Sequence, residues 1–304
     1  MPEIVKTVHT QGYSAYESRY APYVPRDYRD LAALQVLCGD HSERDVTVFT
    51  KNKTLARPWL TIWQDLRTGL IWGWYLSLIP SSETASLAYA DGILTFGAQP
   101  LSRPTEEFYS YIYTDQGRDY RSHDWDDKLI AVHKEAMRID GGLELLLVER
   151  QVGILQDLMV RHILARGYNA KEKPVERVFK DISLWEKDTF VEYCGANPSQ
   201  RPDAWRQLYQ KHRQYEQGKI ADSPFIKFDD YQTSLRRFIQ QYNSCEHERH
   251  SVGCVKVSPM VEFSRLYTTR YELCAQTVSL LLMKSQCRTI RKNGVNCFQG
   301  SLIS

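Results

Sequence analysis

Hydrophobic and polar residues alternate along three stretches in the first third of the chain, a pattern that predicts strands with two different faces. The stretches span residues 45–50, 59–65 and 70–77. They are rich in β-branched and aromatic side chains, which strands favour. The segment Leu66-Arg67-Thr68-Gly69 is typical of a tight turn between two of them. An apolar stretch over residues 31–40 precedes this antiparallel meander, and we expect Asp40 at or just past the end of a first strand.

Farther along, the hydrophobic period changes toward 3.6 residues, which predicts helices. Ser82 is a typical N-cap and Gly97 a typical helix end, so a helix is expected between them. Pro174 suits the first turn of another helix, where Val175, Val178 and Phe179 would face a core. The remaining elements expected are strands over 108–114 and 159–164 and helices over 126–138, 153–158, 203–217 and 227–242.

This order of elements predicts an α/β protein with a mixed sheet flanked by helices. Residues 1–30 are Tyr-rich and interrupted by prolines, and we interpret them as an irregular lead-in. The main domain is expected over residues 31–245, followed by a linker that contains Gly253 and Pro259. Short β-branched runs over 258–304 predict a small β unit without a clear closing element.

Composition narrows the function only in part. A net charge of +2 does not by itself indicate a nucleic-acid partner, so such a partner must be inferred from local patches of basic residues. Seven irregularly spaced cysteines, with no recognisable signal peptide, predict free thiols in a reducing cytoplasm. No apolar run approaches the length of about 20 residues that a membrane span needs, so no membrane association is expected.

Three carboxylates from separate elements are candidates for one metal site. Asp40 and Asp115 follow apolar strands, and Glu176 lies in the first turn of a helix, where the dipole favours its ionised form. Oxygen ligands of this kind suit hard divalent cations such as magnesium. Two ions about 3.5–4 Å apart can clamp the attacking and leaving oxygens of a phosphoryl transfer. The basic neighbours of Glu176, which could contact a phosphate backbone, are Lys173, Arg177 and Lys180.

Four segments of the chain resemble Mu-type transposases, which belong to the DDE transposase and retroviral integrase superfamily. These segments are Val36-Leu-Cys-Gly-Asp40, Trp63-Gln-Asp-Leu-Arg-Thr-Gly69 with Ile71-Trp-Gly-Trp74, Tyr113-Thr-Asp115, and Lys173-Pro-Val-Glu-Arg177. They occur in the family's order, and the resemblance covers residues 30 to 290. It implies an RNase H-like catalytic core followed by a small β-barrel, here incomplete.

The resemblance also implies a function. Asp40, Asp115 and Glu176 would match the family's metal-binding triad and hold two Mg²⁺ ions, with Mn²⁺ as a substitute. Such a core would nick the 3′ ends of an element and join them to target DNA. Members self-associate on DNA, and a full-length protein often meets an ATPase partner that selects the target. A bacterial or phage-encoded protein of the cytoplasm, associated with the nucleoid, is therefore expected. The alternatives are an RNase H-like nuclease without joining activity and a domesticated DNA-binding protein without catalysis.

The sequence departs from the family in one respect. The segment before Asp40 leaves no room for the family's N-terminal domains, which recognise element ends. We interpret the chain as a catalytic-core fragment or a degenerate copy, mainly monomeric without DNA.

Several other residues have two interpretations. Asp65 could be a fourth metal ligand, but its place in the turn favours a role in fixing that turn. Glu172 could replace Glu176, although it precedes Pro174 and should lie outside the helix. Asp119 and Asp124 belong to a polar loop that could touch DNA or simply be solvated.

A cluster of cysteine and histidine residues resembles a zinc site only superficially. Cys245, His247, His250 and Cys254 have a spacing that is not standard for zinc. Cys38 could act as a nucleophile, but a small hydrophobic core residue is the favoured interpretation.

Basic residues gather in the last third of the chain. Residues 264–292 contain six Lys or Arg against one acid, with tyrosines between them. This composition suits phosphate contact, and a solvated face is the alternative. We expect Arg288, Arg291 and Lys292 to bind DNA. The segment 203–217 is similarly basic and has the same two interpretations.

Overall fold

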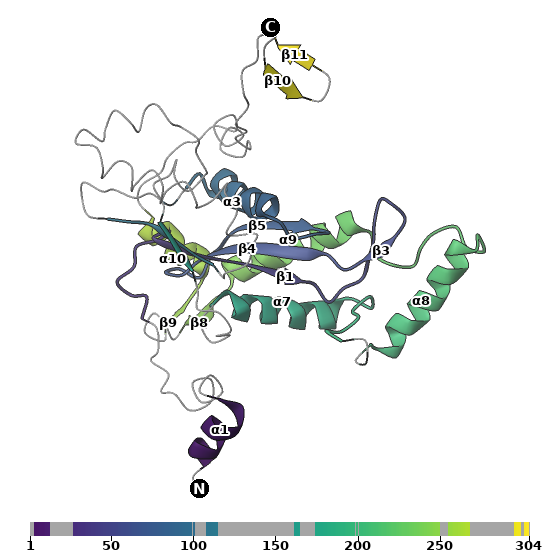
Figure 1. Cartoon of the computed structure of the whole chain (residues 1–304), viewed down its shortest axis with the longest axis horizontal. Helices are drawn as coiled ribbons and strands as arrows, with labels where there is room; N and C mark the ends of the chain where they lie inside the picture. The colour runs from purple at the N-terminus through teal and green to yellow at the C-terminus, as the bar shows by residue number, and fades with distance from the viewer. Residues whose placement is uncertain are drawn as a thin grey trace.

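A five-stranded mixed sheet forms the centre of the computed structural model (Figure 1). The structure describes residues 3–12, 27–98, 100, 108–114, 161–164, 174–197, 199, 201–249, 255–267, 295–298 and 301–303. The strand order is β5-β4-β1-β6-β7. The bounds of these strands are β1 Val36–Glu43, β4 Trp59–Asp65, β5 Ile71–Ser77, β6 Tyr111–Thr114 and β7 Arg161–Leu164.

The sheet combines both strand directions. β1, β4 and β5 form an antiparallel meander, whereas β6 runs parallel to β1 and β7 parallel to β6. The mixed α/β sheet expected from the sequence is therefore confirmed, and it is compatible with an RNase H-like core. Within the described part of the chain, no helix is long and apolar enough to cross a membrane.

Asp65 fixes the turn between β4 and β5, as its place in the sequence predicted. Its fully buried carboxylate accepts hydrogen bonds from the Thr68 hydroxyl at 2.6 Å, the Thr68 N–H at 3.1 Å and the Leu34 N–H at 3.1 Å. Burial raises the pKa of Asp65, and these hydrogen bonds counteract that rise. Gly69 completes the turn at a φ of 76°, which a glycine adopts without strain.

Helices cover both faces of the sheet (Figure 1). α3 (Ser82–Phe96) packs on one face, in a core that contains Leu37 and Trp63. α7 (Val175–Thr189) and α9 (Phe228–Ser244) pack on the other face, in a core that contains Cys38. Successive residues of β1 therefore point to opposite cores, as the pleat of a strand requires.

The caps of α3 agree closely with the sequence pattern. The Ser81 hydroxyl accepts the N–H of Thr84 at 3.2 Å, and the Thr84 side chain accepts the N–H of Ser81, so the cap lies one residue before the Ser82 that we expected. Gly97 ends the helix in the left-handed conformation, as predicted.

Smaller elements complete the described structure. They are α1 (Glu3–Gln11), the β2–β3 pair (Val48–Phe49 and Leu55–Ala56), α8 (Asp203–Glu216), the β8–β9 pair (His247–Arg249 and Val255–Val257), α10 (Pro259–Leu266) and the β10–β11 pair (Val295–Phe298 and Ser301–Ile303). The expected strand at 45–50 is thus only the two residues of β2, and the strand and helices expected at 159–164, 203–217 and 227–242 are confirmed.

Two expectations outside the central sheet were wrong. Residues 3–11 form α1 instead of irregular chain, because the tyrosines and prolines on which that interpretation rested all come later. Pro259 begins α10 instead of lying in a linker, since Ser258 caps the helix and proline suits its first turn. Arg265 therefore lies on a helix and not in a β unit.

Other expectations fall outside the described residues. The β10–β11 pair lies in the segment where the barrel is expected, and the barrel itself remains a prediction. The helices expected at 126–138 and 153–158 also remain predictions.

Candidate active site

Asp40 lies inside β1 and not at its end. The strand continues to Glu43 because β4 pairs with it through that residue, opposite Trp59. Asp40 itself pairs with Ile62 and is partly buried. One carboxylate oxygen accepts the N–H of His41 at 2.9 Å.

The alternation of β1 places Asp40 on the face that α7 covers. Cys38, two residues earlier, is fully buried in the core shared with α7 and α9, which confirms its interpretation as a core residue. Gly39 faces the opposite side, where the ring of Trp63 lies directly over it. Because residues i and i+2 of a strand share a face, Asp40 shares the face of Cys38.

Glu176 comes to the same face of the sheet from α7. The helix begins at Val175, directly after Pro174, so the expected helix start is confirmed. Val175 and Val178 are buried in the α7 core, and α7 packs on β1 and β4. Glu176 is exposed in the first turn, at the positive end of the helix dipole. Arg177 and Lys180 are exposed on the same helix.

Asp115 lies outside the described residues, directly after Thr114, the last residue of β6. Within the described ranges, no three His, Cys, Asp or Glu side chains form a group that could hold a metal ion, and a group that includes Asp115 is not among those tested. The other predicted residues outside the described ranges are Lys173, Glu172, Asp119, Asp124, Arg288, Arg291 and Lys292.

Two members of the unusual Cys-His cluster are described. Cys245 is exposed. The ring of His247 stacks on Tyr242 with 4.2 Å between ring centroids, and its Nε2 lies 2.7 Å from the Tyr242 carbonyl oxygen. This nitrogen holds β8 to the end of α9. His250 and Cys254 lie outside the described residues.

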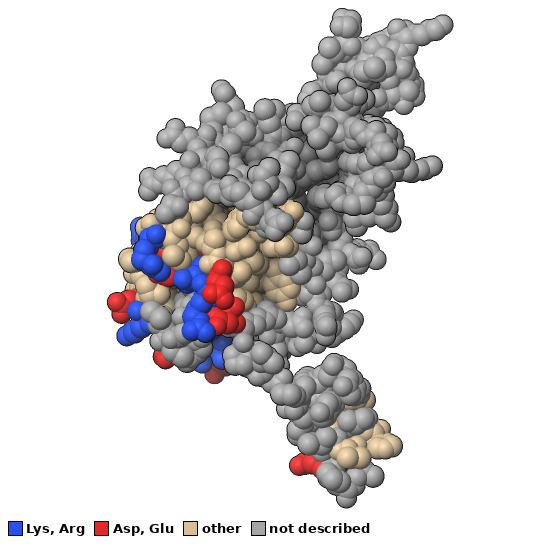
Figure 2. All heavy atoms as spheres, turned by 90° about the vertical axis from the view of Figure 1, so that its left-hand side faces the viewer, with Lys and Arg blue, Asp and Glu red and all other residues tan. Residues whose placement is uncertain are grey.

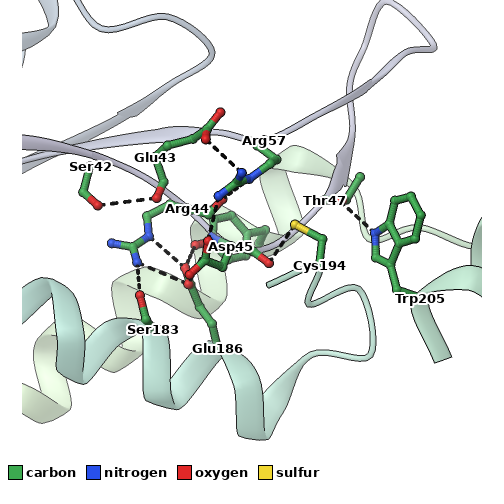
Figure 3. Close-up of polar contacts among 11 residues, drawn as sticks. Ser42, Glu43, Arg44, Asp45, Thr47, Arg57, Ser183, Glu186, Cys194 and Trp205 are labelled. Atoms are coloured by element: carbon green, nitrogen blue, oxygen red, sulfur yellow. Dashed lines mark hydrogen bonds and ion pairs between the residues drawn. The ribbon is translucent and has the colours of Figure 1, made fainter. Parts of the chain in front are cut away.

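The structure adds a buried charged cluster that sequence reasoning missed (Figure 3). Arg44, the residue after β1, donates from Nε to Glu186 of α7 at 3.0 Å. Their side chains are 1% and 0% exposed. Arg44 also donates to the Ser183 hydroxyl at 2.7 Å, and the Tyr231 hydroxyl of α9 donates to Glu186.

This cluster ties three elements together. Burial raises the pKa of Glu186, and the guanidinium of Arg44 counteracts that rise. Removal of either Arg44 or Glu186 would leave the other charge buried without a partner, which would strongly destabilise the fold. Because Arg44 follows β1 and Glu186 belongs to α7, the pair fixes α7 on the strand that carries Asp40. A signal was present in the sequence: Glu186 falls on the apolar stripe of Val175, Val178, Phe179 and Ile182.

The chain is similar in sequence to a bacterial transposase. No protein-family model matches the chain. The transposase of transposon Tn552 from Staphylococcus aureus is 24% identical over 304 residues, which cover 99% of this chain and 52% of that protein. The chain thus spans about half the length of the curated relative that it matches.

Proposed function

We propose that this chain is the catalytic core of a DNA transposase, which nicks DNA strands at the 3′ ends of an element and joins them to target DNA. The observation that supports the proposal most is that Asp40 belongs to the face of β1 that α7 covers, and that Glu176 is in the first turn of α7. The similarity of almost the whole chain to the Tn552 transposase supports the same function. Because the motifs resemble those of Mu-type transposases, we propose a catalytic core of the DDE type.

The register of the parallel strands supports a role for Asp115. Cys38 of β1 pairs with Tyr113 of β6, and both side chains pack in the α7 core. In the sequence, Asp40 comes two residues after Cys38, and Asp115 comes two residues after Tyr113. The same register continued by two residues on both strands would bring the two aspartates level on one face. We therefore retain Asp115 as the third carboxylate.

The described carboxylates suit a magnesium site. Asp40 and Glu176 offer oxygen ligands only, and magnesium typically binds one or two carboxylates together with substrate phosphates. Two such ions, with Mn²⁺ as a substitute, would activate the attacking oxygen and neutralise the charge that develops on the phosphoryl group. They would be held by Asp40, Asp115 and Glu176.

The chain itself would position the DNA. The amino end of α7 is positive, and Arg177 and Lys180 are exposed there. Both can contact the phosphates that flank the scissile bond. Lys173 and the basic residues Arg288, Arg291 and Lys292 would extend this contact. Self-association on paired DNA ends and an ATPase partner belong to the same proposal.

A joining assay tests this function. The full chain is incubated with Mn²⁺, a supercoiled plasmid and duplexes that end in a free 3′-hydroxyl, taken from the DNA that flanks its gene. We expect joined products from the parent and a loss of at least a hundredfold for Glu176→Gln, because glutamine keeps the shape but loses the charge. Glu172→Gln is the matched control and should join normally.

Three other outcomes would change the proposal. Cutting without joining would indicate an RNase H-like nuclease. DNA binding with neither reaction would indicate a non-catalytic protein. Loss of joining in Glu172→Gln but not in Glu176→Gln would assign the third carboxylate to Glu172.

A further inference from the structure

α8 projects from the body of the molecule (Figure 1). Its buried residues, Trp205 and His212, lie on one face of the helix. Trp205, Leu208 and His212 recur at helical spacing and pack against an aromatic cluster that includes Phe49 and Phe225. The indole N–H of the buried Trp205 donates to the Thr47 hydroxyl at 2.9 Å. These contacts hold α8 in one orientation relative to the sheet, so the opposite, outer face of α8 has a fixed orientation too.

The outer face of α8 consists of hydrogen-bond donors and carries no acid between its ends. Its exposed residues are Arg206, Gln207, Gln210, Arg213 and Gln214, with Tyr209 and Lys211 at the borders. The two acids lie at the ends: the Asp203 carboxylate is 3.4 Å from Arg206, and the Glu216 carboxylate is 3.6 Å from the ring of the buried His212. Among the described residues, Lys211 and Arg213 contact no carboxylate.

We propose that this outer face of α8, defined by Arg206, Gln210, Lys211, Arg213 and Gln214, binds the phosphate backbone of duplex DNA. Arginine, lysine and glutamine side chains are common donors to phosphate oxygens. A helix of 14 residues is about 21 Å long, enough to follow several phosphates along one groove. The inference rests on the proposed function, because it supplies that function with a second DNA contact.

The chemistry of the face favours DNA over a protein partner. Protein interfaces centre on buried apolar and aromatic groups. Here the large apolar residue that is exposed is Tyr209, 42% accessible and stacked on Trp205 with 9° between the ring planes. Arg201 lies over the other part of this stack, 4.5 Å from the Trp205 ring centroid. The stack thus places one more cation beside the basic face.

The surface shown in Figure 2 provides a contrast. There, the described Lys and Arg side chains lie among Asp and Glu side chains, so neither sign dominates. Two of the described acid–base pairs, Arg67–Glu262 at 3.2 Å and Arg265–Glu262 at 2.8 Å, show the same intermixing. On the outer face of α8, by contrast, Arg206 is near the carboxylate of Asp203, whereas Lys211 and Arg213 have no carboxylate partner among the described residues.

α8 also lies away from the proposed catalytic carboxylates. It follows the carboxyl end of α7, whereas Glu176 is in the first turn of that helix. α7 has 15 residues and is therefore about 22 Å long. A duplex that contacts both α8 and the reacting phosphate would therefore extend well beyond the proposed catalytic carboxylates.

Binding measurements on charge variants test the proposal. The full chain carrying Arg206→Gln, Lys211→Gln and Arg213→Gln is compared with the parent by fluorescence anisotropy of a 30-base-pair duplex, in EDTA, over a range of salt concentrations. We expect affinity to fall at least tenfold at low salt, equally for unrelated sequences. The slope of log K against log salt should fall by about 0.9 for each lost phosphate contact.

A second triple variant controls for net charge. Lys6, Arg237 and Lys256 are exposed basic residues of other elements, and their replacement by Gln removes the same three charges. This variant should bind nearly as well as the parent. Equal losses in both variants, or no loss in either, would overturn the proposal. Circular dichroism and urea unfolding check that both variants are folded.

The design separates this proposal from the proposed function. Binding in EDTA requires no catalysis, so Glu176→Gln should bind DNA like the parent. A chain that binds through α8 but never joins DNA would keep this inference and remove the proposed function. If the parent joins DNA and the α8 variant binds DNA as tightly as the parent, the proposed function stands and the α8 proposal is overturned. A parent that binds no duplex at all would overturn the α8 proposal.

Discussion

At the scale of single residues, the neighbour of Asp40 has a steric role. Gly39 lies under the ring of Trp63, and a Cβ atom built on Gly39 would be 2.2 Å from a carbon of that ring. Trp63 cannot move away easily, because it is fully buried and its indole N–H donates to the Ala85 carbonyl of α3 at 2.9 Å. The glycine thus allows β1 and β4 to pair closely beside the candidate active site.

Gly39→Ala should therefore destabilise the protein by about 1–3 kcal/mol, the usual cost of overpacking a core. Urea unfolding measures this change. The same substitution in a Trp63→Leu background should cost clearly less, because the ring that causes the clash is gone. An equal cost in both backgrounds would mean that contact with the Trp63 ring is not the reason.

Residue-level prediction from the sequence succeeded where a single residue type determines a local structure. Asp65 was assigned correctly to a turn, because aspartate side chains in turns commonly accept hydrogen bonds from nearby backbone N–H groups. Asp40 was placed at a strand end because residues 40–43 are mostly polar. They belong to the strand all the same, since pairing with β4 satisfies their backbone while their side chains are only partly buried.

At the scale of elements, the buried pair Arg44–Glu186 holds α7 against β1. Removing one partner leaves the other charge buried, and such changes typically cost about 3–5 kcal/mol. We expect Arg44→Met to lower the free energy of unfolding by this amount, measured in urea. The double variant Arg44→Met with Glu186→Leu should recover most of it.

A surface pair is the control for this experiment. Lys51 and Asp229 lie 3.0 Å apart with side chains 83% and 59% exposed, so Lys51→Met should change stability far less. If Arg44→Met were as mild as Lys51→Met, the buried pair would not hold α7 in place.

Elements with a strong period were predictable, and those whose ends depend on tertiary contacts were not. β4, β5, α3 and α9 fall within two residues of their expected bounds. The turn residues 66–69 mark the adjoining ends of β4 and β5, Ser81 and Gly97 cap α3, and the apolar face of α9 recurs at helical spacing. α10 was missed because Pro259 was assigned to a linker, although Phe263 packs in the α3 core and Ser258 caps the helix. Its cap depends on Asn243, whose carbonyl oxygen accepts the Ser258 hydroxyl at 3.0 Å.

At the scale of the whole molecule, the sheet brings together residues from opposite parts of the chain. β1 and α7 are separated by more than a hundred residues, yet they share one core and carry Asp40 and Glu176. The sequence could predict the residue types of this site but not that α7 packs on β1. That arrangement depends on contacts of long sequence separation, including the Arg44–Glu186 pair.

If Asp40, Asp115 and Glu176 form one divalent metal site, as we propose, Mn²⁺ binding should depend on all three carboxylates. Calorimetric titration is carried out on the full chain with a duplex that ends in a 3′-hydroxyl, because such ions also bind substrate phosphates. We predict that the parent binds Mn²⁺ and that Asp40→Asn, Asp115→Asn and Glu176→Gln each weaken binding at least tenfold. Glu172→Gln should bind like the parent. Unchanged Mn²⁺ affinity in the three variants would contradict the claim.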